Sequence, residues 1–155
     1  MAQEIERKFR VRAADWPRPA IGEHILQGYL SSAKERIVRV RVAGENAWLT
    51  IKGLTTGATR LEFEYQIPVA DAHQMIAELC ERPVLEKIRY RIPHDPHVWE
   101  VDEFLGDNAG LLVAEIELAG ESETFELPDW VGEEVTHDAR YFNSNLLVRP
   151  YSRWA

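Results

Sequence analysis

Residues 4–12 read EIERKFRVR, a run in which charged side chains alternate with mostly apolar ones. Glu4, Glu6 and Lys8 occupy alternate positions, and Ile5 and Phe9 lie between and after them. Successive side chains of a β-strand point to opposite faces of the sheet, so a period of two predicts a strand. The segment is therefore predicted to be a strand with one ionic and one largely apolar face.

The same alternation returns along much of the chain. Further strands are predicted over residues 24–30, 37–42, 47–52, 60–67, 86–92, 98–104 and 112–118. Their ionic positions are Arg39 and Arg41, Lys52, Arg60, Glu62 and Glu64, Lys87 and Arg89, Glu100 and Asp102, and Glu115 and Glu117. The positions between them are mostly apolar. Eight short strands favour an antiparallel barrel or sandwich.

Helical signals are few. Residues 70–80 place their apolar side chains on one helical face, with Asp71 as the expected N-cap. A short helix is predicted over residues 121–127, ended by Pro128, and a C-terminal helix over residues 138–148. The predicted fold class is α+β, mainly β, with a few flanking helices. No repeat or long linker divides the chain, which predicts one domain over residues 1–155.

Composition excludes several classes of protein. Of the 155 residues, 45% are hydrophobic and 28% charged, as in a globular protein rather than a disordered one. No apolar run approaches the ~18 residues of a membrane span, so no membrane partner is predicted. The net charge of −8 argues against non-specific nucleic-acid binding. The single cysteine, Cys80, allows no internal disulfide, and the first residues do not resemble a secretory signal, so a cytoplasmic protein is predicted.

The ionic faces contain same-sign pairs. A solvated sheet face is the commonest use of such alternation. However, Arg39 with Arg41, or Glu115 with Glu117, places like charges ~7 Å apart, which favours counter-ions. If the sheet closes with this face inward, its wet interior holds eight carboxylates and seven bases. The complementary ligand is a polyanion with Mg²⁺ or Mn²⁺, because carboxylates suit hard cations and arginine suits phosphate.

The chain resembles a known family at these positions. The pentapeptide at residues 4–8 matches the E-x-E-x-K signature of the CYTH superfamily, also called triphosphate tunnel metalloenzymes. The resemblance continues through Gln27-Gly28-Tyr29-Leu30, Arg39-x-Arg41, Thr50-x-Lys52, Arg60-x-Glu62-x-Glu64, Glu86-Lys87-x-Arg89-Tyr90, Glu100-x-Asp102, Glu115-x-Glu117, Glu134-Val135-Thr136 and Arg140-Tyr141. It implies an eight-stranded antiparallel closed barrel, a tunnel that binds a triphosphate and divalent metals.

The resemblance also implies roles for individual residues. The metal ligands it implies are Glu4, Glu6, Glu115 and Glu117, with Glu62, Glu64 and Asp102 as further candidates. The phosphate-binding residues are Lys8, Arg39, Arg41, Lys52, Arg60, Lys87 and Arg89, with Arg140 from the C-terminal segment. Lys8, Tyr29, Glu4 and Glu6 are the catalytic candidates. A hydrogen bond from Tyr29 to Lys8 is a separate hypothesis. Ala139 departs from the family's usual Lys or Pro.

The predicted function is metal-dependent hydrolysis of inorganic triphosphate to diphosphate and phosphate. One alternative is a class IV adenylate cyclase, although a His-Phe pair usually precedes the signature there and Met-Ala-Gln stands here. Hydrolysis of nucleoside or thiamine triphosphate needs a stacking ring, for which Phe104 is the candidate; the five tryptophans are interpreted as packing residues. A non-catalytic polyphosphate-binding module is the third alternative, and a homodimer is left open.

Overall fold

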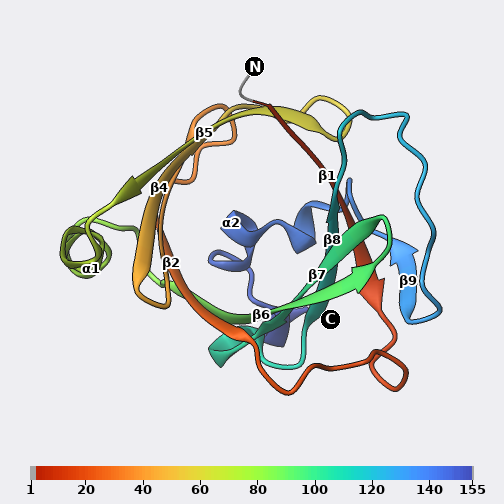
Figure 1. Cartoon of the computed structure of the whole chain (residues 1–155). Helices are drawn as coiled ribbons and strands as arrows, with labels where there is room; N and C mark the ends of the chain where they lie inside the picture. The colour runs from red at the N-terminus through yellow and green to blue at the C-terminus, as the bar shows by residue number, and fades with distance from the viewer. Residues whose placement is uncertain (1–2, 155) are drawn as a thin grey trace.

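The computed structural model describes residues 3–154 (Figure 1). Its strands are β1 (Gln3–Val11), β2 (Glu23–Ser31), β3 (Ile37–Ala43), β4 (Asn46–Lys52), β5 (Thr59–Ile67), β6 (Leu85–His94), β7 (His97–Phe104), β8 (Leu112–Glu117) and β9 (Val131–Glu134). The α-helices are α1 (Val69–Glu78) and α2 (Asn143–Leu146). Short 3₁₀ turns are η1 (Gly106–Asn108), η2 (Ala139–Tyr141) and η3 (Tyr151–Arg153).

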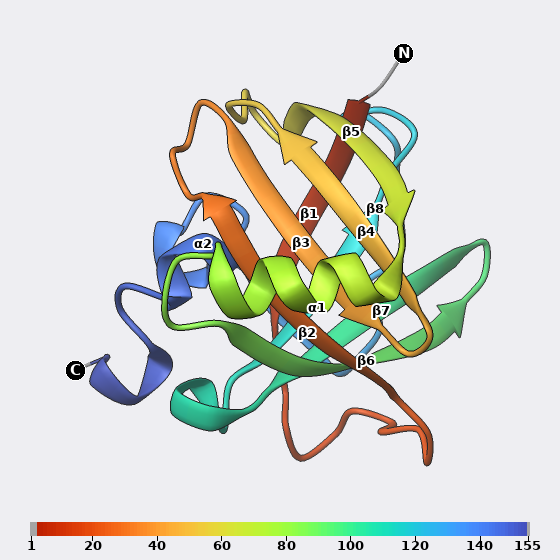
Figure 2. The ribbon, with the colours of Figure 1, turned by 90° about the vertical axis from the view of Figure 1, so that its left-hand side faces the viewer.

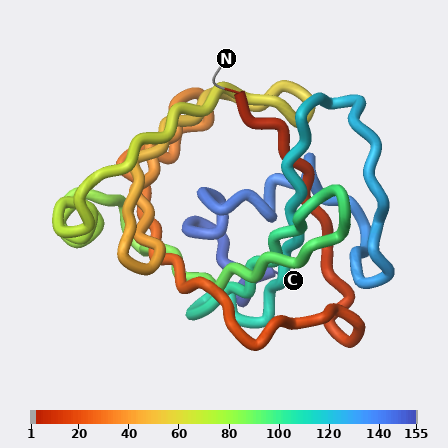
Figure 3. The backbone as a smooth tube through the Cα atoms, in the orientation of Figure 1, coloured from red at the N-terminus to blue at the C-terminus, as the bar shows by residue number. Residues whose placement is uncertain are grey.

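The sheet closes on itself. The strand order is β1-β8-β7-β6-β2-β3-β4-β5, every pairing is antiparallel, and β5 returns to β1 with Glu4 opposite Arg60. Figure 3 follows the backbone around this ring. The predicted eight-stranded antiparallel barrel is confirmed. β9 was not predicted, because its four residues are too few to show a period; it pairs with the second half of β1 outside the ring.

The ionic faces point into the barrel and the apolar faces point outward. α1 lies across β2, β3 and β4 (Figure 2) and covers Val40 and Val42 with Ala72 and Ile76. The loop between β8 and β9 covers the opposite outer wall, where Trp130 packs against Trp99. The outer face of β5 has no such cover and stays exposed. The hydrophobic cores around the ring are therefore mainly outside it, which leaves the interior to charged side chains.

One end of the lumen is apolar. There the inward positions change from charged to hydrophobic within two residues, from Lys87 to Leu85 and from Glu115 to Val113. Tyr141, Leu146 and Leu147 pack against them from the C-terminal segment. Figure 1 shows α2 within the ring of strands. We call residues 139–147 the C-terminal plug.

The helices differ from the prediction in three places. α1 begins at Val69 after Pro68, so Asp71 lies in its first turn and is not the N-cap. The helix expected over residues 121–127 is absent; that segment is a loop, whose Glu123 accepts hydrogen bonds from the Ala119 backbone and His97. The helix expected over residues 138–148 is interrupted at Phe142, which is extended (φ −70°, ψ 130°) and separates η2 from α2.

No helix within residues 3–154 has the length and apolarity needed to cross a membrane.

Candidate active site

A cavity of ≈ 510 Å³ occupies the lumen. All but two of the residues predicted for the site line it; Asp102 and Arg140 do not. The period of two places these side chains inward, and closure brings strands that are distant in sequence together. In a ring of eight, β8 lies opposite β3 and β1 lies opposite β2. The acid pairs of β1 and β8 thus face the wall that carries Arg39 and Arg41.

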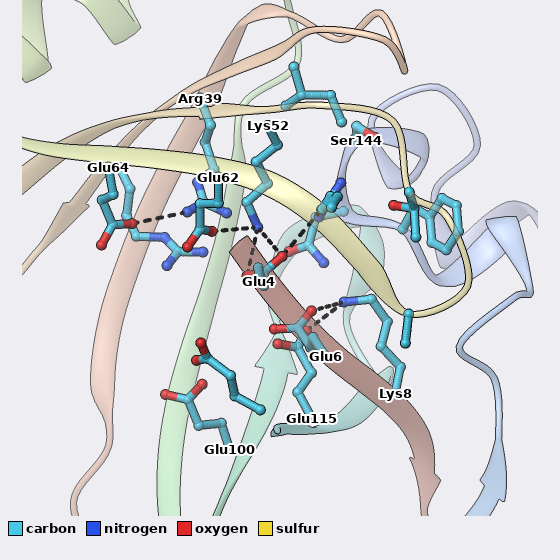
Figure 4. A pocket seen from close by; sticks show the side chains of 18 of the residues that line it. Glu4, Glu6, Lys8, Arg39, Lys52, Glu62, Glu64, Glu100, Glu115 and Ser144 are labelled. Carbon is cyan, nitrogen blue, oxygen red and sulfur yellow. Dashed lines mark hydrogen bonds and ion pairs between the residues drawn. The ribbon is translucent and has the colours of Figure 1, made fainter. Parts of the chain in front are cut away.

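Most of the lumenal cations are neutralised by carboxylates (Figure 4). Lys52 Nζ lies 3.1 Å from Glu4 Oε1 and 3.3 Å from Glu62 Oε2. Lys8 Nζ lies 3.0 Å from Glu6 Oε1 and 2.9 Å from Glu115 Oε1. Burial disfavours the charged ammonium of Lys8, but Glu115 and Glu6 outweigh it and raise its pKa. Lys8 therefore keeps its proton.

The charge of Lys8 acts on its partner as well. Burial raises the pKa of Glu6, yet the neighbouring ammonium of Lys8 lowers it to about 2. Arg60 Nε lies 3.2 Å from Glu4 Oε1, which gives Glu4 a second cationic partner beside Lys52. Glu6 is therefore ionised at neutral pH, and both carboxylates hold their cations through ion pairs.

Asp102 points inward from β7, but it is enclosed by its partners Arg89 and Lys87 and does not line the cavity. It is 0% exposed and accepts from Arg89 Nε at 2.7 Å and from Arg89 Nη2 at 2.9 Å. Lys87 Nζ lies 2.8 Å from Asp102 Oδ2. Burial raises the pKa of Asp102, but Arg89 and Lys87 lower it to about 2. The placement fits a residue that orients Arg89 and Lys87, and it separates Asp102 from the carboxylates that line the cavity.

Arg41 has no carboxylate partner within residues 3–154. Gln27 Oε1 accepts from its Nε at 3.0 Å and from its Nη2 at 2.9 Å. Burial, and then repulsion by Arg39 and Arg89, lower the pKa of Arg41 to about 9. The Nε of Arg39 is buried, and the described part of the chain offers it no acceptor. Arg41 and the Nε of Arg39 are therefore the groups on this wall to which an anion can bind.

Glu117, on the opposite wall, is the negatively charged counterpart of Arg41. No ion pair or hydrogen bond to its carboxylate occurs among the described residues. Partial burial and then repulsion by Glu4, Glu6, Glu62 and Glu100 raise its pKa. Glu117 is exposed in the cavity, so its carboxylate is available to bind a cation.

The donor set fits a hard divalent cation. The lining carboxylates supply only oxygen ligands, as Mg²⁺ and Mn²⁺ prefer. No group of three or more His, Cys, Asp or Glu side chains is preassembled as a metal cage between residues 3 and 154. The carboxylates are instead paired with Lys8, Lys52 and Arg60. A cation would compete with these bases for its ligands.

Three expected placements differ in the structure. Arg140 is exposed and outside the cavity lining, with Nη2 at 2.6 Å from Asp138 Oδ2 and its guanidinium over Trp154. The Tyr29 hydroxyl accepts from Gln27 Nε2 at 3.1 Å, and Lys8 bonds to carboxylates instead, because β2 and β1 are on opposite walls. Phe104 is 1% exposed in the apolar end and offers no stacking surface to the cavity.

The sequence did not identify three residues of the site: Trp48 and Asn143 line the cavity, and Gln27 supports Arg41. Trp48 lines the cavity on β4, and the period of two that selected Lys52 also selects Trp48. Gln27 has the same parity as Tyr29, but its neutral side chain did not enter an analysis based on charge. Asn143 enters from the C-terminal plug, for which no strand period exists.

Comparison with known proteins places this arrangement in a family. A model of the CYTH domain matches residues 2–151. An inorganic triphosphatase of Acetivibrio thermocellus is 49% identical over 154 residues, which cover 99% of each chain. An inorganic triphosphatase of Nitrosomonas europaea is 37% identical over 151 residues, which cover 94% of this chain and 97% of the relative.

The fold agrees with a solved structure. The crystal structure of an inorganic triphosphatase superposes with a TM-score of 0.65 at 31% identity, covering 93% of this chain and 97% of that one. The family model and both relatives extend over nearly all of the sequence that forms the closed barrel. The chain belongs to the CYTH domain family.

Proposed function

We propose that this chain is a divalent-metal-dependent inorganic triphosphatase, which hydrolyses inorganic triphosphate to diphosphate and phosphate. The observation that carries the proposal is the pair of opposed walls: among the described residues, Arg41 has no carboxylate partner and Arg39 Nε no acceptor, and they face Glu117, a carboxylate without a basic partner. A triphosphate with a bound metal supplies both missing charges. The two relatives named as inorganic triphosphatases support the choice of substrate.

The bases would bind and orient the substrate. Arg39 and Arg41 project from one wall, and Lys87 and Arg89 from a neighbouring part of the ring. Arginine suits phosphate oxygens because its guanidinium donates two parallel hydrogen bonds. Phosphoryl transfer gains most from positioning and from charge stabilisation, and fixed cations supply both without reorganising during the reaction.

The carboxylates on the opposite wall would hold the metal. We assign Glu4, Glu6, Glu115 and Glu117 as its principal ligands and Glu62 and Glu64 as further candidates; Asp102 is assigned to orienting Arg89 and Lys87. Mg²⁺ or Mn²⁺ bound there would lower the pKa of an attacking water and neutralise phosphoryl oxygens. A cytoplasmic location belongs to the same proposal and is supported by Cys80, a free buried thiol.

Lys8 and Lys87 differ in the direction in which their pKa values are shifted. Lys8 keeps its proton because Glu115 and Glu6 raise its pKa, so it serves as a fixed positive charge. Burial lowers the pKa of Lys87 to about 7, although Asp102 opposes that shift. Lys87 lines the cavity and is assigned as the candidate base: its unprotonated form would accept a proton from water, whereas its protonated form would bind phosphate.

A substrate panel tests the proposal. Phosphate release is measured from inorganic triphosphate, diphosphate, ATP and thiamine triphosphate, each with Mg²⁺, Mn²⁺ or EDTA, and cyclic AMP is measured in the ATP reactions. We expect fast release from inorganic triphosphate that EDTA abolishes. Cyclic AMP would assign the chain to the cyclases, and binding of triphosphate without any turnover would make it a receptor.

A second candidate function rests on Trp48. This half-buried indole lines the cavity opposite Arg41 on the adjacent strand, where it could stack on the ring of a nucleoside or thiamine triphosphate. A preference for ATP or thiamine triphosphate that Trp48→Ala removes would favour this candidate over inorganic triphosphate.

A further inference from the structure

Two carboxamides, the buried Gln27 and the half-buried Asn143, join two lumenal cations. Gln27 is 0% exposed, and its Oε1 accepts two hydrogen bonds from Arg41. Its Nε2 donates to Tyr29 Oη at 3.1 Å and to Asn143 Oδ1 at 3.3 Å. The same Asn143 Oδ1 accepts from Lys87 Nζ at 2.8 Å. A continuous path of hydrogen bonds thus leads from Arg41 on β3 to Lys87 on β6.

These hydrogen bonds determine on which side each carboxamide places its oxygen and on which side its NH₂ group. Arg41 and the protonated form of Lys87 are donors only, so each must meet a carbonyl oxygen and not an NH₂ group. Gln27 meets this demand at one end and uses its NH₂ group for Tyr29 and Asn143 at the other. Asn143 presents one oxygen to both Gln27 and Lys87. A buried polar network of this kind specifies one arrangement of its members.

The partners of Arg41 differ from those of the other bases. Lys8 and Lys52 are each held by two carboxylates, which cancel their charge. The amide of Gln27 positions Arg41 equally well but carries no net charge. Lys87 is paired with one carboxylate, that of Asp102, and its hydrogen bond to Asn143 adds no second negative charge.

We propose that Gln27 and Asn143 are positioning residues that hold Arg41 and Lys87 through neutral hydrogen bonds, so that Arg41 stays uncompensated for the phosphates of the substrate and Lys87 gains no counter-charge beyond Asp102. Through Asn143, the C-terminal plug becomes part of the phosphate site although it contributes no charge to it. The inference rests on the proposed function, because it assumes that the lumen binds a triphosphate.

Asn143→Asp separates the two possible roles of this side chain. Aspartate keeps the oxygen that accepts from Gln27 and Lys87, so a purely structural role survives the change. It also adds a negative charge beside Lys87. We expect the affinity for inorganic triphosphate to fall by at least about tenfold, whereas the unfolding temperature stays equal or rises because an ion pair with Lys87 is gained.

The affinity is measured by calorimetry with inorganic triphosphate in EDTA, so that no turnover is needed. The measurement is made at pH 6, below the pKa of Lys87 at about 7, so that Lys87 is charged in both proteins. Asn46→Asp is the matched control, because Asn46 lies at the β3–β4 turn and its oxygen accepts only from Gln66 among the described residues. The control should bind as the wild type does.

Gln27→Glu provides the second variant. It keeps the acceptor for Arg41 and adds a charge there, and we expect a similar loss of affinity. Wild-type affinity in Asn143→Asp, or in a folded Gln27→Glu, would overturn the inference while leaving the proposed function intact. A wild type that binds triphosphate without hydrolysing it would overturn the proposed function alone, and one that binds no triphosphate would overturn both.

Discussion

Lys52 and Arg41 project into the same lumen from adjacent strands, yet they are neutralised differently. Lys52 lies between Glu4 and Glu62, and Arg41 rests on the neutral amide of Gln27. Across the ring, Glu117 is a carboxylate that lacks a basic partner among the described residues, whereas Glu4 has two basic partners. The difference indicates two roles for charged side chains. Those with an oppositely charged partner stabilise the barrel, and those without one are available to bind a ligand.

The largest effect is expected at Glu117. Glu117→Gln should reduce metal-dependent phosphate release to the rate measured in EDTA, because it removes the uncompensated carboxylate that we assign to the metal. The unfolding temperature should stay equal or rise, since repulsion by Glu4 and Glu6 disappears. Glu133→Gln, on the exposed side of β9, is the matched control. Full activity of Glu117→Gln would remove this residue from the metal site.

Arg41 should come next. Arg41→Gln is expected to lower kcat/KM about 10³-fold, as loss of a preorganised contact to the transition state does. Stability should change little, because repulsion by Arg39 and Arg89 is relieved at the same time. Steady-state kinetics and thermal unfolding measure the two quantities. Arg10→Gln, an exposed arginine on the same barrel, controls for the lost charge. A large loss of stability would place Arg41 among the structural charges.

Substitution of Lys52 should reduce stability strongly, in contrast to substitution of Arg41. Lys52→Met leaves Glu62 without its cation and Glu4 with Arg60 alone, so the free energy of unfolding should fall by about 3 kcal/mol. Chemical denaturation measures this quantity, and Lys34→Met, at an exposed lysine, should alter it little. Unchanged stability of Lys52→Met would contradict the structural use of compensated pairs.

The pH dependence of turnover gives a smaller effect. Burial lowers the pKa of Lys87 to about 7, so its unprotonated fraction increases as the pH rises toward that value. We expect kcat to rise by about fivefold between pH 6 and pH 7 if Lys87 accepts the proton. Lys87→Arg, which stays charged, should abolish the rise. An unchanged profile in this variant would assign the base elsewhere.

The smallest effect is expected at Arg140. Its guanidinium is exposed and paired with Asp138, outside the cavity lining. Arg140→Ala should therefore change kcat/KM by less than about twofold and stability by less than about 1 kcal/mol. A large rise in KM would show that Arg140 reaches the substrate and would restore the role that the family resemblance implied.

The strands and their two faces, one ionic and one apolar, could be predicted from sequence because a period of two is local information. Glu4, Arg39 and Lys87 were each assigned to the ionic face of the sheet from their parity alone. Closure could not be predicted in that way, and neither could distances across the ring. Tyr29 and Lys8 share an inward parity but lie on opposite walls, which is why the proposed bond between them does not form. The likeness to a family, not the periodicity, indicated the closed barrel.

The C-terminal segment was the least predictable part. Its position depends on packing between Tyr141, Leu146 and the far ends of strands from throughout the chain. The interruption at Phe142 and the path from Asn143 to Lys87 follow from that packing. Short-range patterns carry no signal for contacts of this kind, because the partners are more than fifty residues apart.

The position of the hydrophobic cores outside the ring also bears on how such a protein can change over generations. Packing by α1 and by the loop before β9 secures the outer walls without using the lumenal side chains. A substitution in the lumen therefore alters charge balance but leaves most of the close-packed contacts untouched. Selection can revise the ligand chemistry of the tunnel while the architecture persists, and a protein engineer can use the same freedom.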